Sequence, residues 1–352
     1  MASVALPRRA QRPERLVVDG LDTSVVNDGF LGLVRQGGAE CVHKTLYRED
    51  SFKDFHTFVE ARRDRVALAT TVPEIRAVKA SGRVAFVLGV QTAGGMYGNG
   101  IDDAMDQVPL GSLNAIRPAL TRYYDLGLRV QGLVYNTYNV FGSGCLDHTA
   151  QLTRAGRRLV EEIHRLRIAL DVGGHAGERT SLDAIAMSSG VPIIVTHSNF
   201  ARLNPNQRCI SDRLAESIAR TGGVIGLTAI SDFLVRNAAT AKRDGVTSPV
   251  ATLPVLLDHF DHGKRLVGAE HLGLGPDFNW GQDPVEVDPS DTVSFSPEML
   301  SAGPIRTTKG FEDISKLPAL IAGLKERGWT DRELDLVLGE NWLRVWGRVW
   351  TE

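Results

Sequence analysis

The run HLGLGPDFNW, residues 271–280, constrains the fold most, because a short strand of apolar and glycine residues ends there on an aspartate, Asp277. Two further runs have the same form. VPIIVTHSN (191–199) carries His197 at its end, and VAFVLGVQT (84–92) carries Gln91. A (β/α)₈ barrel gathers the side chains at the C-terminal ends of its parallel strands into one site. The repeated pattern therefore predicts such a barrel, with a single site at its rim.

Short β-rich runs alternate along the chain with longer helical patterns, which is typical of parallel βα units. Eight strands are expected, at 16–20, 39–43, 84–89, 129–134, 168–172, 193–196, 223–227 and 272–275. Between them, residues 154–167 and 211–221 have the periodicity or the start and stop signals of helices. A chain of 352 residues with 43% hydrophobic content is large enough to form one α/β barrel domain over 1–352.

Two segments depart from the regular alternation. Residues 278–310 are rich in Pro, Ser, Gly and Asp and follow the last strand. A long loop at that point is expected to lie over the barrel mouth as a lid, and a plain surface insertion is the alternative. Residues 330–350 begin with a helix-start signal and repeat apolar positions, so C-terminal helices on the barrel wall are expected.

Charge and composition exclude several kinds of partner. The net charge of −2 gives no reason to expect nucleic acid. No run of about 18 apolar residues exists to cross a membrane, and the N-terminus lacks the apolar core of a secretory signal. The three cysteines are odd in number and widely spaced, which is typical of reduced thiols. A cytoplasmic protein without membrane or nucleic-acid partners is expected.

Polar side chains follow nearly every expected strand. In chain order they are Asp19, Asp22, His43, Gln91, Tyr135, Asn136, Asp171, His175, His197, Thr228 and Asp277. Any one of them could be a hydrogen-bonded structural residue. Because a barrel brings all these strand ends together, the set as a whole predicts a functional pocket.

The chain resembles the membrane (renal-type) dipeptidases, peptidase family M19. The matching runs are VVDG at 17–20, THSN at 196–199, Arg208 with ISD at 210–212, GGVIGL at 222–227, GLGPDF at 273–278 and LGENWLRVW at 338–346. They occur in the family's order over nearly the whole chain. The resemblance implies a metallo-dependent-hydrolase-like barrel that holds two metal ions bridged by a glutamate.

Several ligand positions of that two-ion centre differ in this chain. The family's DGHxD run is DGLDT here, so Leu21 and Thr23 stand where histidine and aspartate are implied, and Gln91 stands for the bridging glutamate. Leucine offers no lone pair, and a neutral amide lacks the charge to hold two divalent cations together. A binuclear site is therefore not expected. His197 and His175 would hold a single ion, Zn²⁺ by preference, or none.

The substrate-binding positions match the family better. Arg208 is similar to the family's clamp for a substrate carboxylate, and Asp277 is similar to its proton shuttle. Tyr135 takes the place of a substrate-polarising histidine, and Asn136 and Gln91 are expected to contact substrate. The DGL run, Gln91 and the YNTxNxxGxGC pattern at 135–145 also resemble a divergent bacterial branch of the family. The resemblance implies a small carboxylate-bearing substrate and a homodimer.

Three functions are compatible with these residues. The first is a dipeptidase-like hydrolase of a small dipeptide or amide-bearing amino-acid derivative, with at most one metal ion. The second is a metal-independent lyase, isomerase or cyclase in which Tyr135, His197, His175 and Asp277 act as acids and bases. The third is a non-catalytic protein that keeps the pocket for binding.

Overall fold

The computed structural model describes residues 15–94, 113–147, 150–237, 241–242, 245, 250–282, 286–287, 296, 299–300 and 303–351. Eight parallel strands form the barrel in the order β1-β2-β4-β5-β6-β7-β8-β9. They are β1 (Val18–Asp22), β2 (Cys41–Thr45), β4 (Val84–Val90), β5 (Leu128–Gly132), β6 (Ala169–Asp171), β7 (Ile194–Ser198), β8 (Val224–Leu227) and β9 (Leu272–Leu274). These strands confirm the predicted (β/α)₈ barrel, with each predicted strand found within two residues of its expected start.

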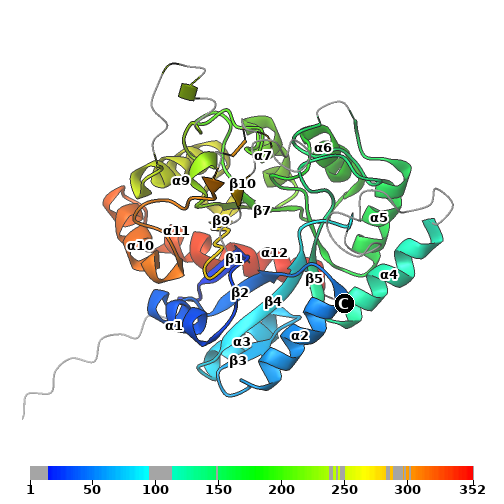
Figure 1. Cartoon of the computed structure of the whole chain (residues 1–352), viewed down its shortest axis with the longest axis horizontal. Helices are drawn as coiled ribbons and strands as arrows, with labels where there is room; N and C mark the ends of the chain where they lie inside the picture. Colours follow the sequence, from blue (N-terminus) through cyan, green and yellow to red (C-terminus); the bar gives the residue numbers. More distant parts are fainter. Residues whose placement is uncertain are drawn as a thin grey trace, which may run out of the picture.

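Helices surround the barrel in chain order (Figure 1). They are α1 (Asp28–Gly37), α2 (Glu49–Glu60), α3 (Val72–Ala80), α4 (Leu113–Asp125), α5 (Arg154–Arg165), α6 (Glu178–Met187), α7 (Asp212–Arg220), α9 (Leu253–Val267), α10 (Leu317–Glu326), α11 (Asp331–Asp335) and α12 (Asn341–Trp350). Side-chain caps define several of their starts. Thr153 caps α5 and Ser211 caps α7, each accepting a hydrogen bond from the backbone N–H of the third helical residue.

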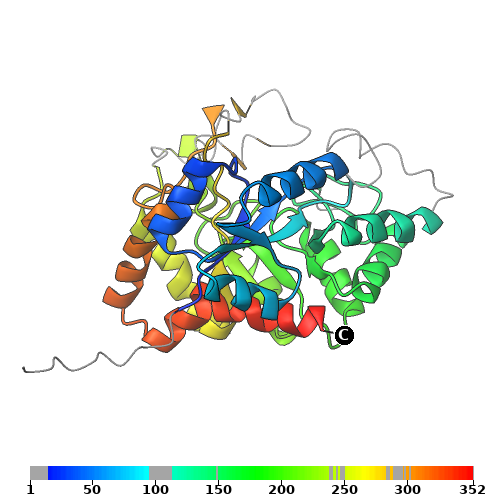
Figure 2. The same cartoon turned by 90° about the horizontal axis from the view of Figure 1, so that it is seen from below.

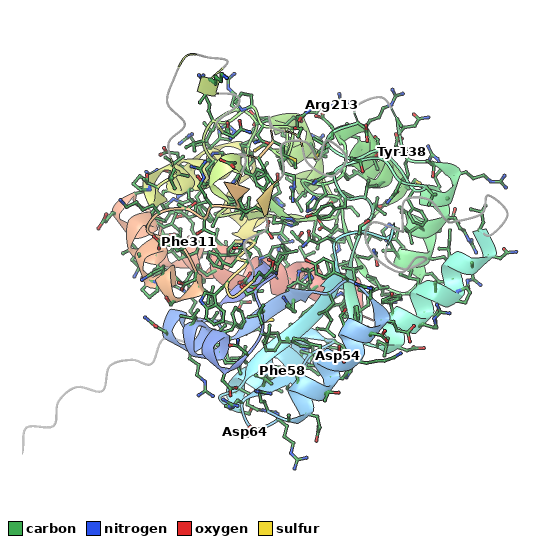
Figure 3. All side chains as sticks on the ribbon, viewed as in Figure 1. Asp54, Phe58, Asp64, Tyr138, Arg213 and Phe311 are labelled. Carbon is green, nitrogen blue, oxygen red and sulfur yellow. The ribbon has the colours of Figure 1, made fainter. Side chains whose placement is uncertain are left out.

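One short strand, β3 (Val66–Leu68), pairs with β4 outside the barrel order. The sequence analysis did not predict it, because three residues carry too little periodicity to mark a strand. Figure 3 shows side chains filling the space between the strands and the surrounding helices, with Asp54 and Phe58 of α2 labelled in the lower part of the view.

The first and last barrel strands meet at the rim through one isolated bridge and a few backbone hydrogen bonds. The backbone N–H of Asp277 donates to the carbonyl of Leu21 at 3.0 Å, and that of Thr23 donates to the carbonyl of Phe278 at 2.9 Å. Asp22 and Phe278 form an isolated parallel bridge. The barrel therefore closes at its C-terminal rim, immediately beside Asp277.

The lower interior of the barrel is apolar and is filled by the C-terminal helix. Trp342 and Trp346 of α12 pack in one cluster with inward-facing Val18, Val87 and Ile194. An added Cβ at Gly20, Gly226 or Gly273 would meet the Trp342 ring, so these strands have glycine where the indole enters. The sequence analysis placed this helix on the barrel wall. Because its tryptophans reach the interior, α12 instead closes the end away from the 286–304 hairpin (Figure 2).

Part of the 278–310 segment lies outside the described residues. Its described parts include a two-residue pairing of β10 (Glu286–Val287) with β11 (Gly303–Pro304). Whether the segment acts as a lid stays a prediction. Among the residues described here, no helix combines the length and apolarity needed to cross a bilayer.

Candidate active site

A pocket opens at the C-terminal ends of the strands, with about 640 Å³ of space unfilled by protein atoms when the open solvent at its mouth is included. Six predicted site residues line it, namely Gln91, Tyr135, Asn136, His175, Arg208 and Asp277. The seventh, His197, is fully buried directly behind them and contacts His175 and Arg208. The structure thus brings together residues that lie as far apart in the chain as Gln91 and Asp277.

His197 is held in one tautomer by a chain of hydrogen bonds. The Thr196 hydroxyl donates to Asp171 Oδ2 at 2.5 Å, so it accepts from His197 Nδ1, which lies 2.7 Å away. The other ring nitrogen, Nε2, then carries a lone pair toward the pocket. Burial and the Arg208 charge lower the pKa of His197 well below its ordinary value, which keeps the ring neutral. Asp171, a predicted candidate, orients His197 and does not line the pocket.

The lone pair on His197 Nε2 faces the guanidinium of Arg208, a cation of the chain itself. Arg208 Nη2 lies 2.5 Å from His197 Nε2, and Arg208 Nη1 donates to the His197 carbonyl at 3.2 Å. Gly174, at φ +64°, makes room for this guanidinium, because an added Cβ would overlap Arg208 Nη1. The glycine directly before His175 therefore leaves room for the arginine beside the two histidines.

His175 is anchored from the opposite side of the pocket. Its Nδ1 lies 2.7 Å from Asn136 Oδ1 and its Nε2 lies 2.8 Å from Gln91 Oε1. The Tyr135 ring stacks on the imidazole with 3.8 Å between centroids. Burial and Arg208 lower the pKa of His175, so the ring is neutral and can donate to only one of these two amide oxygens. The two Nε2 atoms stand 3.1 Å apart.

Asp277 has the electrostatics of an acid–base group. Burial raises its pKa to about 7, against the opposing charge of Arg208 and with a further increase from Asp22. Its Oδ2 lies 3.9 Å from His197 Nε2. Asp277 and Asn136 are non-glycine residues with left-handed backbone, at φ 61° and φ 58°. Such conformations are uncommon and occur preferentially at functional sites.

The residues present do not fit a two-ion centre. Leu21 is fully buried and supplies no donor atom, and the Thr23 hydroxyl donates to the Phe278 carbonyl at 2.7 Å. Within the described part of the chain, no group of three or more His, Cys, Asp or Glu side chains is arranged to hold an ion. The two imidazole nitrogens are spaced like ligands of one tetrahedral ion with bonds of about 2.0–2.1 Å. Arg208 competes for one of them.

Asp22 does not replace the missing ligands. It is fully buried, does not line the pocket, and accepts from the Ser24 backbone N–H at 2.7 Å. Burial raises its pKa to about 6, opposed by the charge of buried Lys44. Asp19, also buried, has its pKa raised well above the ordinary value by burial and by Asp22. These groups form a charge cluster behind the pocket.

The other strand-end candidates are structural. His43 Nδ1 lies 2.6 Å from the Gly20 carbonyl, and its ring stands edge-on to Trp346 inside the barrel. The Thr228 hydroxyl donates to the Pro276 carbonyl at 3.1 Å. Each supports a strand end or its loop, which is the alternative that the sequence left open for single polar residues.

Several pocket residues were missed by the sequence analysis. They are Thr23, Tyr47, Ile230, Phe233, Asn279, Gln282, Met299, Leu300 and Ile305. Tyr47 follows β2 and could have been found by its place after a strand end. The apolar members lie in loops whose approach to the pocket is set by tertiary contacts. A strand-end search for polar residues gave no signal for them.

A parallel (β/α)₈ barrel with a histidine pair, an acid and an arginine at its C-terminal rim defines a metallo-dependent-hydrolase-like protein. The profile of the membrane dipeptidase family (peptidase family M19) matches residues 35–304 and 286–351. The chain therefore belongs to this family of hydrolases, whose members are metal-dependent peptidases. The resemblance predicted from the sequence is confirmed.

Known relatives are moderately similar. A Klebsiella pneumoniae protein named "Uncharacterized protein in pqqA 5'region" is 28% identical over 82% of this chain and 90% of its own length. "Dipeptidase verJ" of Clonostachys rogersoniana is 28% identical over 84% of this chain and 63% of its own length. The solved structure of an amidohydrolase from Pseudomonas aeruginosa, 24% identical, has a TM-score of 0.79 over 96% of this chain and 97% of its own. That likeness supports the fold.

Proposed function

We propose that this chain hydrolyses a small dipeptide, or another amide-bearing amino-acid derivative with a carboxylate, using at most one metal ion. The observation that carries the proposal is the placement of an acid–base group, Asp277, 3.9 Å from the neutral His197 beside a cationic Arg208 in one pocket. Membership of a dipeptidase family and the dipeptidase named among its relatives support the reaction class.

Arg208 is suited to bind the substrate carboxylate. Its Nη atoms contact His197, but its Nε is buried and has no hydrogen-bond partner in the structure. A guanidinium has five N–H donors, so donors remain for a ligand. The positive charge of Arg208 at the wall of the pocket therefore favours an anionic substrate.

Asp277 would transfer the proton, and Tyr135 would donate a hydrogen bond to the oxyanion. With a pKa of about 7, an ionised Asp277 can take a proton from the attacking water and return it to the leaving amine. Water thereby supplies hydroxide to the carbonyl carbon and a proton to nitrogen. Burial raises the pKa of Tyr135, so its hydroxyl stays protonated and can donate to the developing oxyanion.

His175 and His197 are the residues that would hold a single ion, which would supply Lewis-acid polarisation of the scissile carbonyl. For this, Arg208 has to release the His197 lone pair. Neither Leu21 nor Gln91 supplies the charge or the donor that a second ion needs.

Metal analysis and turnover test the proposal together. The protein, purified without chelator, is assayed for metal content and for hydrolysis of a dipeptide panel. We expect between zero and one ion per chain and measurable hydrolysis, lost in Asp277→Asn and retained in the matched surface change Asp54→Asn, on exposed α2 (Figure 3). Two ions per chain would refute the metal assignment. Absence of turnover on the whole panel would refute the hydrolase.

We also propose a cytoplasmic homodimer. The free thiols of Cys41, Cys145 and Cys209 support a reducing compartment. Light scattering of the purified chain tests the oligomeric state, and a monomer at micromolar concentration would contradict it.

A further inference from the structure

The pocket has one apolar side that the proposed chemistry does not use. Its members are Ile230, Phe233, Met299, Leu300 and Ile305, which we call the apolar wall. All but Ile305 are at most 5% exposed, and Cys145 packs with them in a small cluster separate from the barrel core. The polar residues Gln91, Tyr135, His175 and Asp277 line the same pocket.

The apolar wall adjoins the expected carboxylate clamp. The Arg208 guanidinium carbon lies 5.3 Å from the centre of the Phe233 ring. Phe233 belongs to a 3₁₀ turn, η3 (Ser231–Phe233), directly after β8. A carboxylate bound to Arg208 would therefore place the substituent on its own α-carbon within reach of Phe233.

Polar contacts behind the apolar wall hold its two parts together. Arg306 forms an ion pair with buried Asp232 at 2.8 Å, next to Phe233 in the sequence. The Asn206 amide donates to the carbonyls of Asp232 and Met299, at 2.9 and 2.8 Å. These contacts tie the loop after β8 to the segment that carries Met299 and Arg306. The apolar wall is therefore preformed in the structure without a ligand.

We propose that this wall selects substrates whose carboxylate-bearing residue has a large apolar side chain, such as a dipeptide ending in leucine or phenylalanine. This inference rests on the proposed carboxylate clamp. Burying a leucine side chain against these residues removes three more carbons from water than alanine does. A charged side chain would lose its hydration there without gaining a partner from the wall.

The test is a dipeptide series with a constant N-terminal residue: Ala-Ala, Ala-Leu, Ala-Phe, Ala-Asp and Ala-Lys. We expect kcat/KM for Ala-Leu to exceed that for Ala-Ala by about 50-fold, from about 0.8 kcal/mol per buried carbon. Ala-Asp and Ala-Lys should fall below Ala-Ala. Equal values, or a preference for the charged residues, would overturn the inference while leaving the hydrolase intact.

A variant links the preference to the wall. Ile305 is only partly buried, so Ile305→Asp risks the fold less than a change at Met299, which is fully buried. It should reduce the Ala-Leu over Ala-Ala ratio at least tenfold, whereas Ile305→Leu should keep the ratio. The matched control, Leu203→Asp, changes an aliphatic residue that is 43% exposed and not in the pocket, and should also keep it. An unchanged ratio in Ile305→Asp would overturn the assignment.

If none of the series is hydrolysed, the proposed function fails, and the wall is tested by calorimetric binding of the same dipeptides. Tighter binding of Ala-Leu and Ala-Phe than of Ala-Ala would support the apolar preference without catalysis. Equal binding, or none, would overturn it.

Discussion

The two ends of the barrel are formed by the same strands but differ in packing and polarity. At the α12 end, Trp342 enters against Gly20, Gly226 and Gly273, and its indole N–H donates to the Leu274 carbonyl at 3.0 Å. At the pocket end, buried Arg208 Nε and Asp22 Oδ2 lack partners, and Asp277 has strained backbone. The closed end fills its space with packed rings, although buried Trp346 Nε1 and Asn341 Oδ1 also lack partners there. The open end differs in having a pocket lined by polar and titratable side chains, which is typical of a site that awaits a ligand.

The largest expected effect is a loss of stability from a change at the closed end of the barrel, where α12 packs. Trp342→Ala removes a fully buried indole from the barrel interior and should cost about 3–5 kcal/mol of unfolding free energy. Chemical denaturation measures this loss. Trp280→Ala, at a half-buried position near the open end, is the control and should cost less. Equal losses would show that the two ends do not differ in their share of stability.

Next, Asp277→Asn tests the open end. The amide cannot take or return a proton, so kcat/KM for a hydrolysed dipeptide should fall about 10²–10⁴-fold. Thermal melting should show no loss of stability. A drop in melting temperature with little loss of turnover would reverse the assignment and make Asp277 a structural residue.

Arg208→Met tests two proposed roles of the guanidinium, namely carboxylate binding and competition with zinc for His197. Loss of the charge–carboxylate contact should weaken binding of a carboxylate ligand by about 2–4 kcal/mol. The same change frees the His197 lone pair, so zinc should bind the variant more tightly than the wild type. Calorimetry with each ligand measures both effects. If the carboxylate affinity is unaltered, Arg208 does not bind the substrate carboxylate. If the zinc affinity is unaltered, Arg208 does not compete with zinc for His197.

The smallest expected effect is a pH dependence of stability. The folded-state pKa of Asp277 is raised from 3.8 to about 7, so the folded state binds more protons than the unfolded state between these values. The contribution of this group to stability is therefore full below pH 3.8 and is lost as the pH rises toward 7. Denaturation of wild type and Asp277→Asn at pH 5 and pH 8 should show the variant gaining relative stability at pH 8. A constant difference would argue that Asp277 has an ordinary pKa.

Much of the fold was predictable because strand patterns are local. The run LGLG before Asp277 and the run IIVT before His197 mark buried strands by composition alone, and barrel closure then places their ends together. Short β3 and the entry of α12 into the interior were not predictable. The first has too few residues, and the second depends on three glycines that face one indole only in the folded chain.

The site was predictable where its residues follow strands. Gln91, Tyr135, His175 and Asp277 line the pocket as expected. The contact of Arg208 with His197 was not foreseen, because it depends on the left-handed Gly174 making room for a side chain from another loop. The apolar wall was missed for the same reason: Met299 and Phe233 meet only through tertiary ties.

The rim closure between β1 and β9 joins a sparsely paired seam to the chemistry. Asp277 is attached there to Leu21 by one backbone hydrogen bond, and the seam has one bridge, Asp22 with Phe278, whereas β2 and β4 pair over five residues. Thermal fluctuation that parts this seam would displace the acid while the helices and the other strands remain in place. Heating should therefore abolish turnover several degrees before circular dichroism reports melting, so the working range of the catalyst is narrower than that of the fold.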